Sequence, residues 1–147
     1  MPAARKLAIA CDHAGFFLKK AIKEAYGTRF DWIDLGTDSS ESCNYADYGH
    51  AMGEAITSGR TDRGIIICGS GIGISIAANR HRAVRAALCT NSTMARLSRL
   101  HNNANVLALG ARITGLAVAL DCVDAFMATD FEGGRHEERI KKLDQGI

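Results

Sequence analysis

The sequence lacks several features that mark particular protein classes. Its one proline is Pro2, and its five cysteines (at 11, 43, 68, 89 and 122) form no C-x-x-C pair and have no histidine at zinc-ligand spacing. These absences argue against a structural zinc site and a disulfide framework. Because an odd, scattered set of cysteines suits a reducing compartment, we expect a cytoplasmic protein.

Long apolar runs and a strong charge imbalance are also missing. No segment reaches the roughly 18 apolar residues of a membrane span, and no apolar run follows the first charges as it does in a signal peptide. The formal net charge is +2, too small for a nucleic-acid footprint. We therefore expect neither a membrane nor a nucleic acid among its partners.

What the chain does contain is typical of one globular domain over residues 1–147. Its 147 residues are 47% hydrophobic and 23% charged, and a chain of that size can bury a core without disulfides or a metal. We therefore expect no structural metal.

Short apolar runs alternate with stretches of helical spacing, which predicts an α/β fold with a parallel sheet. The expected strands are 7–11, 30–35, 64–68, 84–89 and 106–109. The expected helices cover 17–25, 45–58, 72–80, 92–101, 114–128 and 135–143. Strands that are apolar throughout, such as 65–67, indicate a Rossmann-like sheet with both faces covered, and ligands then bind at the carboxyl ends of its strands.

The most informative segment is 65–75, where an apolar strand ends at Cys68 and three alternating glycines lead into a helix. Glycines let the backbone approach a ligand, and the first amides of the helix favour an anion. A tight strand-to-helix turn is the alternative. The G-x-G-x-G spacing does not match the dinucleotide fingerprint G-x-G-x-x-G.

Cys68 is the last residue of the expected strand, directly before this glycine loop. Amide dipoles at that point favour thiolate over thiol, so the sulfur could act as a base. The alternative is a small buried apolar side chain like those of the other four cysteines. Its place at a strand end is what favours a role in chemistry.

Two further groups of polar residues lie at strand ends. Asp12 and His13 follow the first strand, where they either contact a ligand or merely cap a helix. His101 and Asn102 precede the fifth strand, and Arg112 follows it. A histidine suits a proton donor near neutral pH, although one at a helix C-terminus is also common.

Arg135 and Arg139 lie four residues apart, on one face of the last expected helix. Two guanidinium groups that point the same way can hold a phosphate. The alternative is a solvated face paired with Glu137 and Glu138.

Four motifs together resemble the type-B ribose-5-phosphate isomerase family, which also includes galactose-6-phosphate and allose-6-phosphate isomerases. They are A-C-D-H-A-G-F at 10–16, I-C-G-S-G-I-G-I-S-I-A-A-N at 67–79, L-S-R-L-H-N-N-A-N-V-L-A-L-G at 97–110 and F-E-G-G-R-H at 131–136. The resemblance covers nearly the whole chain. It implies a three-layer αβα sandwich and a homodimer, or a dimer of dimers, with active sites shared between subunits.

The resemblance also implies roles for single residues. Cys68 would accept the proton and His101 would open the sugar ring. The residues that would contact the sugar phosphate are Asp12, His13, Tyr45, Gly69, Ser70, Gly71, Ile72, Gly73, Asn102, Arg112, Arg135 and Arg139, with the 69–73 segment around the enediolate.

Two positions refine this resemblance. One branch of the family lacks the cysteine and has Glu at the position of Ile74, so this chain resembles the cysteine branch. Many members read Asp-Tyr-Pro where this chain has Asn44, Tyr45 and Ala46, which removes a carboxylate near the sugar. The expected reaction interconverts ribose 5-phosphate and ribulose 5-phosphate, with allose or galactose 6-phosphate as alternative substrates. Because this isomerisation needs neither a redox cofactor nor a metal, we expect no cofactor and no metal.

Two readings from other classes remain as alternatives. A sugar-phosphate sensor without catalysis would keep the glycine loop and the arginines but would lose Cys68 or His101, and both are present. A thiol redox switch at Cys68 would explain neither His101 nor the paired arginines.

Overall fold

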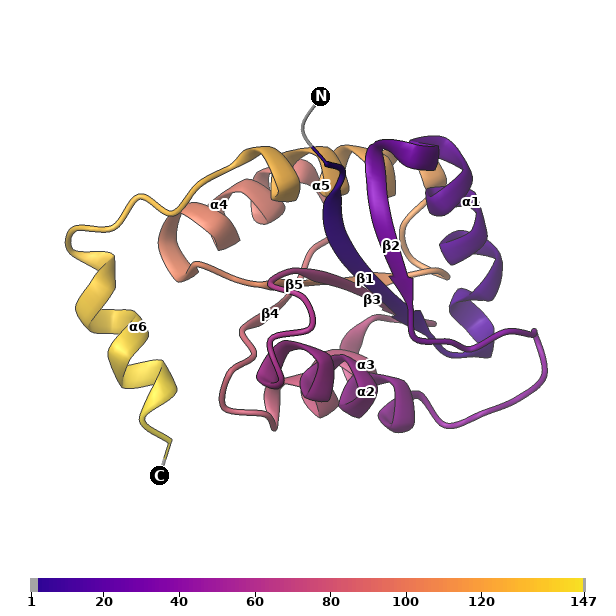
Figure 1. Ribbon diagram of the computed structural model, residues 1–147, viewed down its shortest axis with the longest axis horizontal. Helices are drawn as coiled ribbons and strands as arrows, with labels where there is room; N and C mark the ends of the chain where they lie inside the picture. The colour runs from indigo at the N-terminus through magenta and orange to yellow at the C-terminus, as the bar shows by residue number, and fades with distance from the viewer. Residues whose placement is uncertain (1–2, 147) are drawn as a thin grey trace.

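The computed structural model describes residues 3–146, which form a five-stranded sheet between two layers of helices (Figure 1). The strands are β1 (Arg5–Cys11), β2 (Phe30–Asp34), β3 (Gly64–Cys68), β4 (Ala86–Leu88) and β5 (Val106–Gly110). All pairs are parallel, in the order β2-β1-β3-β5-β4. The predicted α/β fold and its parallel sheet are confirmed.

Six α-helices surround the sheet. They are α1 (Phe16–Tyr26), α2 (Tyr45–Thr57), α3 (Ile72–Asn79), α4 (Ser92–Asn102), α5 (Leu116–Ala128) and α6 (His136–Asp144). Figure 1 shows α2 and α3 on one face, α1, α4 and α5 on the other, and α6 beside the sandwich. Two short 3-10 helices, His13–Gly15 and Gly27–Arg29, flank α1 and were not predicted.

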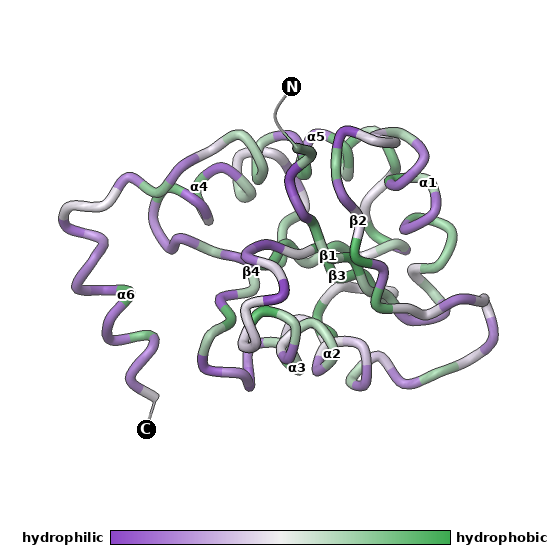
Figure 2. Tube along the Cα trace, in the orientation of Figure 1, coloured by the Kyte–Doolittle hydropathy of each residue, from purple (hydrophilic) through white to green (hydrophobic). Residues whose placement is uncertain are grey.

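The strands read as apolar throughout because each one supplies two cores. In β3, Ile65 and Ile67 pack under α1, α4 and α5, whereas Ile66 and Cys68 face α2 and α3. This period of two is that of an extended strand. Figure 2 shows the sheet as the hydrophobic centre of the molecule.

Differences from the predicted boundaries are small. The fourth strand was predicted over 84–89 but spans only Ala86–Leu88, because the Arg85 amide donates to the side chain of Asn105 instead of continuing the ladder. No helix within residues 3–146 has both the length and the apolar character that crossing a bilayer requires.

An ion pair between buried Lys19 and the more exposed Asp34 fixes the segment that follows β2. The ammonium of Lys19, 3% exposed, donates to Asp34 at 2.8 Å and to the Thr37 carbonyl at 2.6 Å. Burial by itself raises the pKa of Asp34, but hydrogen bonds from Lys19, Lys23 and the Gly36 amide outweigh it, so the pKa is lowered overall.

Candidate active site

A cleft of about 610 Å³ opens at the carboxyl edge of the sheet, where the sequence predicted it. Nine of the predicted site residues line it. They are Asp12, His13, Tyr45, Cys68, Gly69, Ser70, Ile72, Gly73 and Arg112. Gly71 belongs to the same loop without lining the cleft.

The sulfur of Cys68 faces the glycine loop. Cys68 ends β3, is 4% exposed, and its Sγ accepts a hydrogen bond of 3.1 Å from the Gly71 amide. The loop therefore turns a main-chain donor toward the sulfur. Cys68 is thus buried in the core under α2 and α3, as the alternative interpretation expected, but its sulfur also has a main-chain donor in the glycine loop.

The loop has the conformation that this contact needs. Gly71 has φ +81°, in the left-handed region, and a Cβ there would lie 2.5 Å from Leu88 and 2.9 Å from the Leu109 backbone. Ser70 Oγ accepts from the Ile72 amide, while the next amide of α3, that of Gly73, lies in the first turn, where no intrahelical acceptor exists. The loop thus offers main-chain donors to an anion in the cleft.

The other cysteines differ in their surroundings. Burial raises the pKa of Cys11 to about 11 and that of Cys89 to about 12, and it also raises the pKa of Cys122. These three thiols keep their protons near neutral pH.

The segment after β1 brings the imidazole of His13 into the cleft, and one hydrogen bond fixes its tautomer. The Cys43 amide donates to His13 Nδ1 at 3.2 Å, so in the neutral ring the proton is on Nε2, which becomes a donor. Asp12 also caps a helix, because its Oδ1 accepts from the amides of Ala14 and Gly15. The capping alternative is confirmed for Asp12, which lines the cleft as well.

The loop after β5 places a cation beside Cys68. The Ala111 amide donates to the Cys68 carbonyl, and the Arg112 amide to the Gly69 carbonyl, both at 2.9 Å. A Cβ on Gly69 would lie 3.3 Å from Arg112 Nη1, so the guanidinium lies directly against the glycine loop. Arg112 thus adds a fixed positive charge to the cleft.

The remaining predicted residues gather elsewhere. His101 and Asn102 end α4, and the His101 ring stacks on His136 of α6 with centroids 4.5 Å apart and planes 18° apart. Arg135 and Arg139 flank that histidine. Arg135 pairs with Glu132 at 3.6 Å, not with the predicted Glu137 or Glu138.

This second cluster lies at the opposite edge of the sheet. In a parallel βαβ unit the helix runs back along the strands, so α4 ends near the amino end of β5. Cys68 pairs with Gly110, at the carboxyl end of β5. Five residues at about 3.3 Å each separate the two edges by about 16 Å, so one chain does not bring His101 to Cys68.

Comparisons with known proteins give the family of this chain. The family model described as Ribose/Galactose Isomerase matches residues 7–143. The ribose-5-phosphate isomerase B of Escherichia coli K12 is 45% identical over 95% of this chain and 94% of its own. The chain belongs to the ribose/galactose isomerase family. That membership makes it an isomerase.

Solved structures of the same family match the fold closely. The ribose-5-phosphate isomerase of Thermotoga maritima is 50% identical and superimposes with a TM-score of 0.94, covering 97% of this chain and 99% of that one. The ribose-5-phosphate isomerase B of Mycoplasma genitalium with bound ribulose-5-phosphate is 37% identical, with a TM-score of 0.91, 98% of this chain and 97% of that one.

The second cluster of this isomerase contains a residue that the sequence reading missed. His136 is 4% exposed, and its Nε2 is buried without a hydrogen-bond partner. Desolvation lowers the pKa of His136, as do the charges of Arg135 and His101. Its position next to Arg135, at the start of the last helix, was the available signal.

His101, Glu132 and His136 form a group, within residues 3–146, whose potential metal-ligand atoms lie within 4.8 Å of one another. The two rings stack at 18° to each other, and His136 Nε2 lies 3.8 Å from Glu132 Oε2. The cluster thus contains one carboxylate besides the two imidazoles, and Arg135 and Arg139 add positive charge to it.

Apolar side chains at the cleft mouth were also missed. Ile76 and Ile113 line the cleft with Ile72, and they are 50%, 65% and 53% exposed. Ile72 and Ile76 are one helical turn apart on α3, which is the signal that could have grouped them. They give the isomerase an apolar rim around a polar floor.

Proposed function

We propose that this isomerase interconverts ribose 5-phosphate and ribulose 5-phosphate through an enediolate, with Cys68 as the base. The observation that carries the proposal is the hydrogen bond from the Gly71 amide to Cys68 Sγ at the floor of the cleft. The names of the relatives support the substrate. Allose 6-phosphate and galactose 6-phosphate remain the alternative substrates.

The chemistry follows from the groups around the cleft. The Cys68 thiolate removes the proton from C2 of the open-chain aldose, and the negative charge spreads to O1 of the resulting enediolate. Amides of the 69–73 segment and Arg112 stabilise that charge. Return of the proton to C1, with transfer of the O2 hydroxyl proton to O1, gives the ketose.

Ring opening needs an acid, a role that the family resemblance gives to His101 rather than to His13 in the cleft. In the proposed mechanism, His101 protonates the ring oxygen as the C1–O4 bond breaks and the O1 hydroxyl loses its proton. Asn102 would then bind the sugar, and Arg135 and Arg139 the phosphate. Since His101 and Cys68 lie at opposite edges of the sheet within one chain, His101 would come from a second copy.

A homodimer, alone or within a dimer of dimers, would complete both sites. In a twofold dimer every contact between the two chains occurs twice. The cleft of each chain can therefore face the His101 cluster of the other chain. The exposed Ile72, Ile76 and Ile113 offer apolar area for such an interface. The proposed active site is therefore shared.

A turnover assay with ribose 5-phosphate, allose 6-phosphate and galactose 6-phosphate tests the reaction. We expect Cys68→Ala to lower kcat by about 10²- to 10⁴-fold, as loss of a catalytic acid or base does. The control is Cys122→Ala, which removes a buried thiol from the opposite core. Near-normal turnover by Cys68→Ala would rule out the base, and binding without turnover in the wild type would favour a sensor.

Mixing two inactive variants tests the shared site. A hybrid of Cys68→Ala and His101→Asn contains one site with both residues intact only if the two residues come from different chains. An equimolar, re-equilibrated mixture should then recover about one quarter of wild-type turnover. No recovery, despite mass-spectrometric detection of hybrids, would contradict a shared site.

A further inference from the structure

The last helix of the chain is attached along one narrow stripe. Its buried residues are His136 and Ile140, and Asp144 follows four residues later on the same face. Figure 1 shows α6 beside the sandwich rather than over the sheet, and Figure 2 shows that it is mostly hydrophilic. Apolar packing, which has no preferred direction, therefore does little to fix its rotation.

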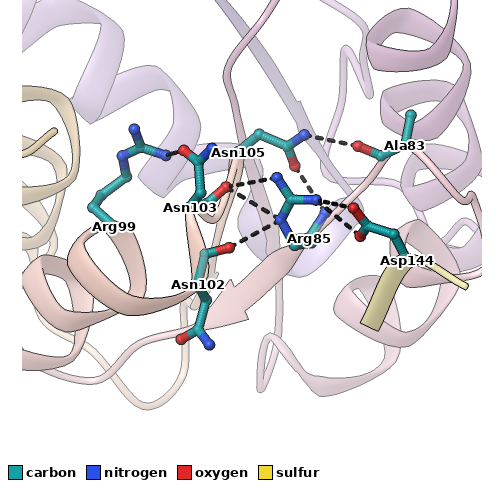
Figure 3. A network of polar contacts seen from close by, with 7 residues as sticks. All are labelled: Ala83, Arg85, Arg99, Asn102, Asn103, Asn105 and Asp144. Atoms are coloured by element: carbon teal, nitrogen blue, oxygen red, sulfur yellow. Dashed lines mark hydrogen bonds and ion pairs between the residues drawn. The ribbon is translucent and has the colours of Figure 1, made fainter. Parts of the chain in front are cut away.

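A directional contact holds the far end of this helix. Arg85 Nη1 donates to both carboxylate oxygens of Asp144, each at 2.8 Å (Figure 3). Arg85 Nε donates to the Asn102 carbonyl at 2.9 Å, and Nη2 to that of Asn103 at 3.3 Å. One guanidinium thus joins the last turn of α6 to the last turn of α4.

Arg85 itself is anchored to the body of the protein. Its amide donates to Asn105 Oδ1 at 2.8 Å, and the Asn105 side-chain amide donates to the Ala83 carbonyl at 2.8 Å (Figure 3). The pair is only partly exposed, with side-chain exposures of 20% for Arg85 and 39% for Asp144. Most exposed ion pairs join two flexible side chains and contribute little. This pair differs from them because Arg85 is anchored and also donates to two main-chain carbonyls.

The attached face determines where the neighbouring residues point. Arg135 and Arg139 each precede a residue of the stripe by one position, which is about 100° around the helix. A rotation of α6 of that size would turn both arginines away from their present positions beside His101.

We propose that Arg85, through Asp144, is a positioning residue that fixes Arg135 and Arg139 relative to His101. This inference rests on the proposed function, in which that cluster binds the sugar phosphate. Arg85 contacts no reacting atom in this account. It acts by holding the ends of α4 and α6 together.

The test compares Asp144→Asn, which removes the charge but keeps the side-chain shape, with Lys142→Ala, an exposed position on the same helix. We expect faster hydrogen–deuterium exchange across 136–145 in Asp144→Asn alone, at an unchanged denaturation midpoint. KM for the sugar phosphate should rise about tenfold with little change in kcat, as for loss of uniform binding. Asp144→Glu should recover part of this loss.

Binding of inorganic phosphate, followed by hydrogen–deuterium exchange, provides a measurement that does not depend on turnover. It should slow exchange of α6 amides in the wild type and in Lys142→Ala, and much less so in Asp144→Asn. Unchanged exchange in Asp144→Asn, or faster exchange with normal KM and normal phosphate protection, would overturn the positioning role. Absence of turnover in the wild type would instead refute the proposed function, and the exchange measurement with phosphate would remain valid.

Discussion

Substituting Gly71 with alanine tests whether the loop amide activates Cys68. At φ +81° an alanine is strained by about 1–2 kcal/mol. Its Cβ would also lie 2.5 Å from Leu88 Cδ1 and 2.9 Å from the Leu109 carbonyl carbon. The leucine side chain can move, but the Leu109 backbone belongs to the buried strand β5, so the loop must move.

The expected cost is large for activity and tolerable for folding. Strain and overpacking together should lower the free energy of unfolding by about 2–5 kcal/mol, within the 5–15 kcal/mol of a typical domain. A shifted loop withdraws the Gly71 amide from Cys68 Sγ. Loss of one preorganised donor of this kind lowers kcat by about 10²- to 10³-fold, or about 3–4 kcal/mol.

Denaturant unfolding, kcat and the rate of Cys68 alkylation by iodoacetamide are measured on the same samples. The matched control is Gly115→Ala, because Gly115 has φ −70° and nothing within 4 Å of an added Cβ. We expect the control to resemble the wild type in all three measurements. A folded Gly71→Ala protein with the kcat and alkylation rate of the control would refute the reasoning, since the amide would then not be what activates the sulfur.

Two further predictions concern ionisation. Because burial raises the pKa of Cys11 to about 11 and that of Cys89 to about 12, peptide mapping after brief iodoacetamide treatment at mildly alkaline pH should find Cys68 labelled well before either. Labelling of Cys11 or Cys89 before Cys68 would contradict this order. The lowered pKa of Asp34 stabilises the folded state at neutral pH, and this contribution is lost as the pH falls below about 4 towards the folded-state pKa. Asp34→Asn removes the charge that Lys19 contacts but keeps an oxygen acceptor, so it should cost about 1.5–3 kcal/mol at neutral pH and give a shallower acid-side loss in pH-dependent denaturation; an acid limb as steep as in the wild type would contradict the linkage.

The sheet and the cleft could be predicted because they depend on local pattern and on one topological rule. The apolar run at 65–67 requires two covered faces, and parallel strands bring their carboxyl ends to one edge. That rule places Cys68, Asp12 and Arg112 together although they are far apart in the sequence, and the structure has all three around one cleft.

The contacts that orient these groups could not be predicted in the same way. The amide of Cys43 reaches His13 from a loop without periodicity, so no spacing indicates it. Arg85 and Asp144 are 59 residues apart, and neither residue lies in a motif. No local pattern indicates that His136 is buried and stacked on His101 of another helix.

The division of the polar residues between two edges follows from the parallel order itself. Each helix that follows a strand begins at the carboxyl edge of the sheet, where the free amides of its first turn favour anions. It ends at the amino edge, where its C-terminus favours groups that carry positive charge. The sequence places Gly71 and Gly73 at the first kind of position and His101 at the second. The proposed reaction needs an anion cradle and a proton donor around one small sugar, so it would draw on both edges, which a rigid sheet keeps about 16 Å apart. We therefore infer that a second copy of the chain brings the two edges together more simply than any rearrangement within one chain, because twofold pairing needs no change in the fold.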